Sequence, residues 1–296
     1  MTIRIAHFTD IHFTELPSRV PLRKLLSKRL LGWANMKVFG RYADFEKTTL
    51  VAQALTKDLA SQNLDGIVFT GDLTGLSLET EFAAAKQGLA PLLEDHRVLG
   101  IPGNHDVYTF GSKGAFERHF AAWIRSEGDE PETYPIVRTY GDEAAVIAVK
   151  DVRPCLPHDS SGHLPADQIE RLRRIVGELE GRVIVLAMHY CIRMQDQSRD
   201  SYFHRLRNDR QVLKLAEDLG IDLIICGHVH HRSVHRRGEG SPVAFANPGS
   251  VSHGRRGRIY HVLTIEDGEI ELSARQFDAE TSTFQEWAQA PQIGRL

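Results

Sequence analysis

Short apolar runs recur along the chain, with longer stretches of mixed polarity between them. Runs rich in Val, Ile, Leu and Phe are typical of strands that are buried on both faces. They predict strands at Ile3–Phe8, Gly66–Thr70, Val98–Ile101, Ala144–Val149, Val183–Met188, Leu223–Cys226, Val243–Ala246, Ile259–Ile265 and Glu269–Arg275. Apolar positions at helical spacing predict helices at Phe45–Ser61, Glu79–Glu94, Lys113–Arg125, Ala166–Gly177 and Asp209–Leu219.

The order of these elements is βαβα at first and becomes richer in strands over residues 242–276. Asp267-Gly268, between the last two predicted strands, is a hairpin signal. This order predicts an α/β fold. The chain has 296 residues, and its candidate site residues extend from position 10 to position 230, so we predict a single domain over residues 1–296.

Composition is that of an ordinary globular protein, with 42% hydrophobic residues, 25% charged residues and a formal net charge of -3. The overall charge therefore gives no indication of a nucleic-acid partner. A strand is predicted from Ile3 on, and no apolar run approaches about 20 residues, so we expect neither a signal peptide nor a membrane span. We therefore expect a cytoplasmic location. Cys155, Cys191 and Cys226 show no paired spacing, and Cys226 lies in an apolar strand, so we expect a buried thiol at Cys226 and a reducing compartment.

A basic amphipathic segment over residues 16–43 departs from this ordinary pattern. It contains no acidic residue between Leu16 and Ala43, while the apolar side chains Leu22, Leu25, Leu26, Leu30 and Trp33 recur at helical spacing on the side opposite the basic ones. The basic residues are Arg19, Arg23, Lys24, Lys28, Arg29, Lys37 and Arg41. Three interpretations stay open: a surface helix packed on the core, a cap over the substrate, and a surface that lies on an anionic membrane and makes the protein peripheral there.

Five short blocks carry the chemistry, and each of them follows a predicted strand. They are Asp10-Ile11-His12, Gly71-Asp72, Gly103-Asn104-His105-Asp106, His189 and Gly227-His228-Val229-His230. Ligand sites of α/β proteins lie beyond the carboxyl ends of the strands, so these blocks are expected to converge. Carboxylate, imidazole and amide oxygen suit Mn, Fe or Zn, and the absence of thiolates argues against a structural zinc site.

The five blocks, in this order, resemble those of the calcineurin-like metallophosphoesterases. The resemblance implies two mixed β-sheets packed as a sandwich with helices outside, and two divalent metal ions (Mn²⁺, Fe²⁺/Fe³⁺ or Zn²⁺). It implies that the first ion is held by Asp10, His12 and His230, the second by Asn104, His189 and His228, and that Asp72 bridges them. It further implies hydrolysis of a phosphoester by a hydroxide held between the ions, with His105 protonating the leaving oxygen and Asp106 orienting His105.

Within that family the Gly-Asn-His-Asp block and the length look most like the bacterial class III cyclic-nucleotide phosphodiesterases, which implies a cyclic nucleotide-like phosphodiester substrate. One alternative is a phosphoesterase or pyrophosphatase acting on a lipid-linked or nucleotide-diphosphate substrate at the membrane surface. Against it, bacterial enzymes that cleave the UDP-diacylglucosamine precursor of lipid A commonly carry arginine where this chain has His105. A scaffold without catalysis is opposed by the intact Asp10, Asp72, Asn104 and His105.

A second basic region flanks the last block. His231, His235 and His253 stand among six arginines between positions 232 and 258, and the region forms either a solvated face or a rim that binds a second phosphate. Its Gly254-Arg255-Arg256-Gly257-Arg258 tract lacks interleaved aromatic residues, so it is not evidence for nucleic acid. The sequence makes no prediction of oligomeric state.

Overall fold

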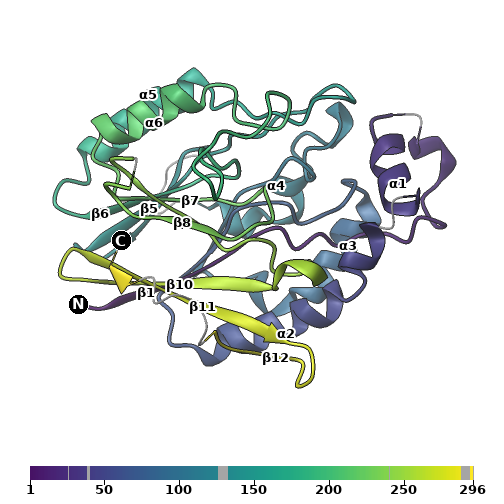
Figure 1. Ribbon diagram of the computed structural model, residues 1–296, viewed down its shortest axis with the longest axis horizontal. Helices are drawn as coiled ribbons and strands as arrows, with labels where there is room; N and C mark the ends of the chain where they lie inside the picture. The colour runs from purple at the N-terminus through teal and green to yellow at the C-terminus, as the bar shows by residue number, and fades with distance from the viewer. Residues whose placement is uncertain (26, 39–40, 126–132, 240, 288–293, 296) are drawn as a thin grey trace.

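The computed structural model describes residues 1–25, 27–38, 41–125, 133–239, 241–287 and 294–295. Two mixed β-sheets pack face to face, and helices cover the outer face of each sheet (Figure 1). This α/β sandwich confirms the predicted fold class. Both sheets contribute to one buried apolar cluster, so the two layers share a core.

The first sheet has the strand order β12-β11-β10-β1-β2-β3, and β13 pairs with β11. The strands β1, β2 and β3 run parallel, whereas β10, β11 and β12 are joined antiparallel to them and to each other. The bounds are β1 Ile3–Phe8, β2 Gly66–Phe69, β3 Val98–Gly100, β10 Ile259–Glu266, β11 Glu269–Asp278, β12 Thr283–Glu286 and β13 Gly294–Arg295. The parallel arrangement sends the first three strands toward the same edge of the sheet.

The second sheet has the order β4-β5-β6-β7-β9-β8, with β5, β6, β7 and β9 parallel and an antiparallel strand at each edge. The bounds are β4 Ile136–Tyr140, β5 Ala144–Ala148, β6 Val183–Ala187, β7 Leu223–Ile225, β8 Ser233–His235 and β9 Ala244–Asn247. The neighbours β6 and β7 therefore deliver His189 and His228 side by side.

The helices are α1 Arg29–Val38, α2 Thr48–Ser61, α3 Glu79–Gly88, α4 Ala115–His119, α5 Ala166–Gly177 and α6 Asp209–Asp218. The helix α2 begins three residues later than predicted, and two other predicted helices are much shorter than expected. The one predicted over Glu79–Glu94 ends at Gly88 and is followed by a separate 3-10 turn, Ala90–Leu92, because Pro91 cannot continue an α-helix. The one predicted over Lys113–Arg125 begins only after Gly114, whose φ of 76° is left-handed, and is followed by a 3-10 turn at Ala121–Ile124.

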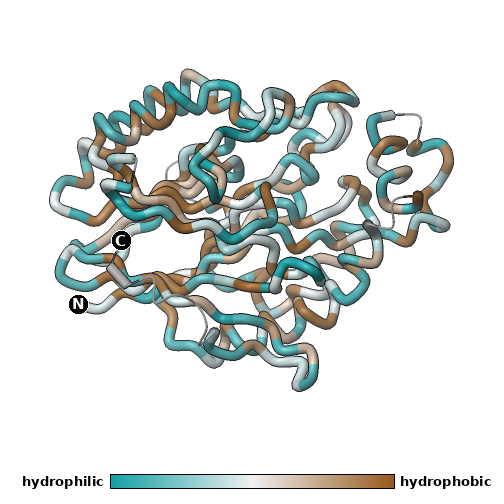
Figure 2. The backbone as a smooth tube through the Cα atoms, viewed as in Figure 1, coloured by the Kyte–Doolittle hydropathy of each residue, from teal (hydrophilic) through white to brown (hydrophobic). Residues whose placement is uncertain are grey.

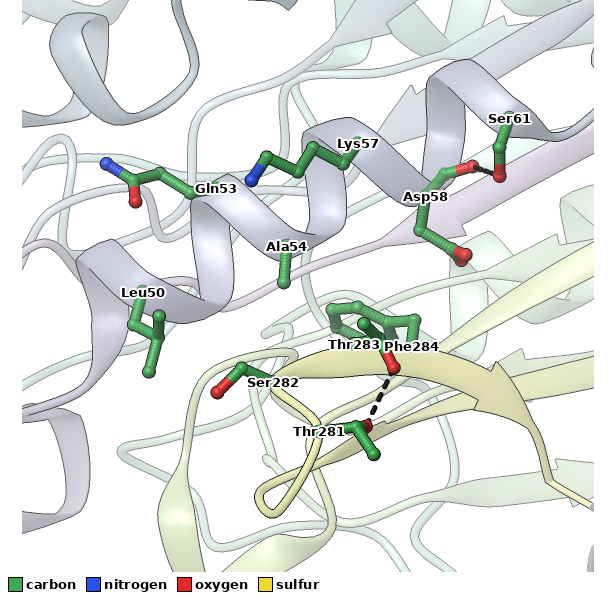
Figure 3. A pocket seen from close by; sticks show the side chains of 10 residues that line it. All are labelled: Leu50, Gln53, Ala54, Lys57, Asp58, Ser61, Thr281, Ser282, Thr283 and Phe284. Carbon is green, nitrogen blue, oxygen red and sulfur yellow. Dashed lines mark hydrogen bonds between the residues drawn. The ribbon is translucent and has the colours of Figure 1, made fainter.

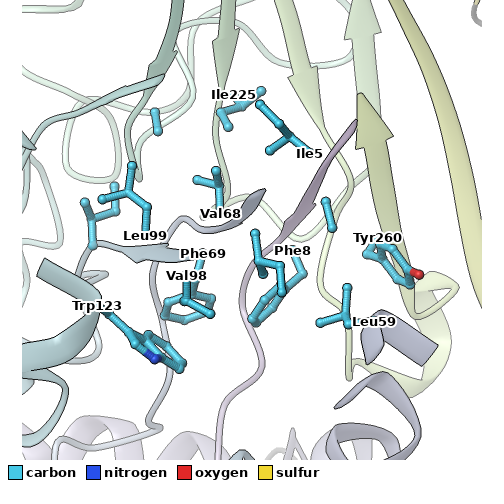
Figure 4. Close-up of a cluster of buried hydrophobic side chains, with 14 of the residues drawn as sticks. Ile5, Phe8, Leu59, Val68, Phe69, Val98, Leu99, Trp123, Ile225 and Tyr260 are labelled. Carbon is cyan, nitrogen blue, oxygen red and sulfur yellow. The ribbon is translucent and has the colours of Figure 1, made fainter. Parts of the chain in front are cut away.

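Alternate side chains of β1 and β2 pack on opposite faces of the sheet. Ile5 and Val68 meet Ile225 of the second sheet, whereas Phe8 and Phe69 face the helical layer, as Figure 4 shows. A second apolar cluster joins the other sheet to α5 and α6. In Figure 2 the strands form the hydrophobic interior, and the helices present hydrophilic stretches outward.

The structure bears on two further sequence-based expectations, one about the cysteines and one about a membrane span. Cys191 and Cys226 form a disulfide with their Cα atoms 5.4 Å apart, so the expectation of a thiol at Cys226 is wrong. The sequence alone does not show this pairing, because the two residues are 35 positions apart and come together only through the neighbouring strands β6 and β7. Cys155 is buried and free. Among the described residues, no helix has the length and apolar character required to cross a membrane.

Candidate metal centre

The five blocks converge at the carboxyl ends of β1, β2 and β3 in one sheet and of β6 and β7 in the other. Backbone hydrogen bonds join the first two loops, from the Asp10 N–H to the Gly71 carbonyl (2.9 Å) and from the His12 N–H to the Asp72 carbonyl (3.1 Å). The main chain therefore holds these two loops together without help from side chains. The blocks were expected to converge in this way, because ligand sites of α/β proteins lie beyond the carboxyl ends of the strands.

The backbone is left-handed at five of the predicted ligands. The φ angles are 53° at Asp10, 48° at His12, 62° at Asp72, 70° at His228 and 55° at His230. A non-glycine residue in this region costs about 1–3 kcal/mol, and such strain gathers where function requires it. The strain marks these loops as a site independently of the residue types.

A first ligand group consists of Asp10, His12, Asp72 and His230, whose ligand atoms all lie within 4.8 Å of one another. The Nε2 atoms of His12 and His230 are 2.9 Å apart, and His230 Nε2 is 3.0 Å from Asp10 Oδ1. His12 Nε2 lies 3.7 Å from Asp72 Oδ2. Ring nitrogens and carboxylate oxygens that point at one small space are arranged as ligands of a cation.

A second group consists of Asp72, His189 and His228. Asp72 Oδ2 is 3.5 Å from His189 Nε2, so this carboxylate belongs to both groups. Asn104 Oδ1 lies 3.0 Å from His189 Nε2 and 2.9 Å from His228 Nδ1. All seven predicted ligands are therefore brought together, with Asp72 between the two groups.

The electrostatics of the pocket fit cations. Asp10 and Asp72 are fully buried, and every ion-pair partner of theirs in the described part of the chain is a histidine. Burial raises the pKa of Asp72 well above its usual range, and the neighbouring Asp10 adds to the effect. Two divalent ions would neutralise these carboxylates, and the mixed carboxylate, imidazole and amide ligands suit Mn, Fe or Zn.

Three of the four metal-facing imidazoles are held from behind by a backbone carbonyl. His12 Nδ1 donates to Thr74 O (3.1 Å), His189 Nδ1 to Thr70 O (2.8 Å), and His228 Nε2 to His204 O (2.8 Å). Such bonds fix the ring orientation and leave the other nitrogen to the ion. Burial also lowers the pKa of His228 well below its usual range, which keeps its ring neutral, as a ligand requires.

Two carboxylates brace the loops. Asp106 accepts hydrogen bonds from the N–H groups of Gly103 (2.9 Å), Leu73 (3.0 Å) and Thr74 (2.9 Å), so it joins the Asp72 loop to the Asn104 loop. Asp151, which the sequence reading missed, accepts from the N–H groups of His189 (3.1 Å) and Tyr190 (2.9 Å). Its position just after a predicted strand was the signal that could have revealed it.

His105 lies beside the bridging carboxylate. Its N–H donates to Asp72 Oδ1 (2.7 Å), and its ring Nδ1 donates to Gly75 O (2.6 Å). The Gly75 carbonyl thus anchors the His105 ring and Asp106 supports the loops, while the role of Asp106 in orienting His105 stays a prediction. With Nδ1 anchored, Nε2 is the ring nitrogen through which His105 would act on a substrate.

An open cleft of about 500 Å³ lies over the ligands. Asp72, Asn104 and His105 line it, and Asn35 of α1 and Arg256 stand at its rim. The remaining lining residues are Ser160, Met194, Asp200, His204, His228, Val229, His230 and His231. An adjoining hollow of about 320 Å³ is also lined by Asn35 and Arg256, so both side chains face the approach to the site.

The predicted basic rim is only partly in the cleft. His231 and Arg256 line the cleft, and Arg256 Nη1 donates to Val229 O (3.1 Å), between two ligands. Arg255 is ion-paired with Asp44 through Nη2 (2.5 Å). His235 is buried and bonds Met194 O (3.0 Å), and His253 is buried 3.6 Å from Asp44.

Another pocket, of about 420 Å³, lies between α2 and β12, away from the metal loops (Figure 3). Its charged residues are Lys57 and Asp58, and Asp58 is engaged by Arg275 (2.7 Å). It contains neither imidazole nor a group of carboxylates. The cleft over the five blocks is therefore the candidate site.

The segment of residues 16–38, here called the cap segment, stands beside this cleft at the edge of the molecule (Figure 1). Leu25 and Met36 pack in a small cluster with Leu76, Leu78 and Tyr108. Arg29 Nε donates to Leu76 O (2.7 Å), Lys28 Nζ bonds Asp159 O, and Trp33 Nε1 donates to Pro17 O (2.7 Å). These contacts anchor the segment on the rest of the protein, and Asn35 brings one side of it to the cleft, while its role as a cap stays a prediction. Leu26 lies outside the described residues.

The comparisons with known proteins agree with this geometry. The model of the calcineurin-like phosphoesterase family matches residues 3–232. A dimetal phosphatase from Danio rerio is similar in structure, with a TM-score of 0.65 at 9% identity, covering 96% of this chain and 98% of that one. The purple acid phosphatase PPD1 from yellow lupin seeds has a TM-score of 0.58 at 11% identity, and this chain spans 53% of it, with 97% of this chain covered. No curated protein matches the chain. At these identities the solved structures show the shared fold.

Proposed function

Because the chain belongs to the calcineurin-like phosphoesterase family, we propose that it hydrolyses a phosphodiester, cyclic nucleotide-like in kind, at the cleft over Asp72. The observation that carries the proposal is the sharing of Asp72 by two ligand groups, with the backbone N–H of His105 bound to the same carboxylate. This arrangement supports a role for His105 as a proton donor beside a dinuclear centre.

When bound, two divalent ions would supply Lewis-acid activation of the attacking water and neutralise charge on the phosphoryl oxygens. Asp10, His12 and His230 would hold one ion, Asn104, His189 and His228 the other, and Asp72 both. The left-handed loops and the carbonyls behind the rings fix these side chains before substrate arrives, which avoids reorganisation during the reaction.

His105 acts on the leaving oxygen. The bond from Nδ1 to Gly75 O holds the ring so that Nε2 would deliver a proton as the phosphorus–oxygen bond breaks. Tyr108 stacks on the ring at a centroid distance of 5.2 Å and limits its rotation. Asn35 and Arg256, at the rim, would contact the ester groups that flank the reacting phosphate.

A second candidate substrate is a lipid-linked or nucleotide-diphosphate phosphoester. Its support is specific: Arg256 and His231 offer cationic or hydrogen-bonding groups for a further phosphate, and the cap segment exposes apolar side chains beside the cleft. A non-catalytic scaffold has no comparable support, because the chain retains the full ligand set and His105.

The test compares four substrates with Mn²⁺-, Fe²⁺- or Zn²⁺-loaded protein: a cyclic nucleotide, a nitrophenyl diester, a nitrophenyl monoester and a nucleotide-diphosphate lipid. We expect the diesters to have the highest kcat/KM, and Asp72→Asn, with its reduced metal content, to abolish turnover of all four. Protein that holds two ions and yet leaves both diesters intact would refute the diesterase proposal. Preference for the diphosphate lipid would select the second candidate.

A further inference from the structure

The cap segment has an outer face that no described part of the protein covers. On α1, Leu30, Ala34 and Val38 are spaced four residues apart and form a stripe along one side of the helix. Leu30 and Val38 are 48% and 70% exposed, and Leu31 beside them is 52% exposed. Figure 2 shows hydrophobic stretches on this outlying segment, at the right of the view. Met36, on the opposite side of the same helix, is buried, and Asn35, which lines the cleft, lies on the flank of the helix next to Leu31.

Packing does not explain this stripe. The cap segment is already anchored by Leu25, Met36, Arg29 and Trp33 on its inner side. Clustered exposed apolar side chains are unfavourable in water and mark contact surfaces. Leu22, in the 3-10 turn Leu22–Leu25, is 81% exposed, so the cap segment has four exposed leucine or valine side chains.

The charged residues of the cap segment itself are all basic. Arg19, Arg23, Lys24 and Lys37 are exposed, and no acidic residue occurs between Leu16 and Ala43. Lys37 lies over the Trp33 ring at 4.8 Å. The whole chain carries a formal net charge of -3, so the positive charge here is local to the cap segment. Exposed apolar side chains with basic residues at their border are the combination that binds anionic lipid.

We propose that the outer face of the cap segment docks on an anionic phospholipid bilayer, with Leu22, Leu30, Leu31 and Val38 entering the headgroup boundary. Arg19, Arg23, Lys24 and Lys37 then contact lipid phosphates. A second copy of this chain is a poorer occupant, because a two-fold contact would set one basic surface against an identical one. Docking in this way brings the mouth of the cleft to the lipid surface, since Asn35 and Val38 belong to the same helix.

The experiment measures co-sedimentation of the full chain with vesicles of phosphatidylcholine, with and without phosphatidylglycerol. We expect binding only when the anionic lipid is present, and weaker binding as salt is added. Arg23→Glu with Lys24→Glu should lower the partition coefficient by roughly 30-fold or more, because each basic residue near the surface contributes about a fivefold factor and each new glutamate is repelled by the anionic lipid. Leu30→Ser with Leu31→Ser and Val38→Ser should lower it by about tenfold or more.

The chain offers matched controls. Arg173→Glu with Arg174→Glu reverses two adjacent exposed charges on α5, and Leu50→Ser with Phe110→Ser removes exposed apolar side chains elsewhere. These controls should bind vesicles as the parent does. All variants should keep the parent's melting temperature, metal content and kcat on a soluble nitrophenyl diester, so failure of docking is distinguishable from failure of the proposed function.

Four outcomes would overturn the proposal. The parent protein could fail to bind anionic vesicles, or could bind neutral vesicles equally well. The control pairs could lose binding as much as the cap variants. Finally, sedimentation velocity could show a parent dimer that the triple serine variant loses, without any vesicle binding, which would assign the stripe to self-association.

Discussion

Replacing Glu81 by glutamine should flatten the dependence of the protein's stability on pH. Glu81 is buried at the start of α3, where Oε2 accepts the N–H groups of Leu76 (2.7 Å) and Leu78 (3.1 Å) and Oε1 that of Glu15 (3.1 Å). It therefore ties the loop after Asp72 to the loop after His12. Burial raises its pKa from 4.5 to about 7, and the three N–H bonds and Arg29 offset only part of that rise.

The sign follows from proton binding. The folded protein holds this proton more tightly than the unfolded chain, so the stabilisation is complete below pH 4.5 and is lost as pH rises toward about 7. At about 1.4 kcal/mol per pH unit, this interval corresponds to roughly 3 kcal/mol in the free energy of unfolding. Glutamine resembles the protonated side chain and does not titrate, so the variant lacks this loss.

Urea unfolding of both proteins at several pH values from about 5 to 8 measures the difference, in which the other titrating groups largely cancel. The unfolding free energy of Glu81→Gln should rise relative to the parent as pH increases. Glu94→Gln, at an exposed position, is the control and should run parallel to the parent. If the parent instead gains stability over Glu81→Gln with rising pH, the three N–H groups hold the carboxylate ionised and the argument from burial is wrong.

Three further predictions concern the site. Asp72→Ala should leave at most one ion per chain by elemental mass spectrometry and abolish activity, because two cations lose their shared carboxylate; two retained ions with near-normal turnover would contradict the assignment. His105→Ala should keep both ions and lower kcat by about 10²–10⁴, with a smaller loss for nitrophenyl than for alkyl esters; equal losses would argue against proton donation. Asn35→Ala should raise the KM for a diester by roughly tenfold and leave metal content unchanged, whereas an unchanged KM would place the ester group elsewhere in the cleft.

The fold was predictable where strands are buried on both faces. All nine predicted strands are present, because most of them are near-continuous apolar runs and β11 alternates buried with exposed positions. The strands that the sequence did not reveal are β4, β8, β12 and β13. The first three lie at sheet edges and mix buried with partly or fully exposed positions, so their pattern resembles that of loops.

The candidate ligands were predictable because their residue types follow strand ends, and strand ends converge. The supports of the ligands were not. Asp151 and Asp106 act through hydrogen bonds to N–H groups of loops that are distant in the chain, such as that from His189 to Asp151, 38 positions apart. A single sequence does not show which loop a carboxylate will meet. It likewise does not show the left-handed backbone at Asp10 or His12, which only the surrounding contacts impose.

The cap segment shows why an amphipathic pattern does not by itself say which side is buried. Leu22, Leu25, Leu30 and Trp33 share one face only if a single continuous helix runs through them. The structure instead has a 3-10 turn at Leu22–Leu25 and a separate helix from Arg29, which changes the register between the two halves. Leu25 is consequently buried while Leu22 and Leu30 are exposed, and Lys28 and Arg29 turn inward to backbone carbonyls instead of outward. The same break that anchors the cap segment beside the cleft also leaves its apolar stripe in solvent.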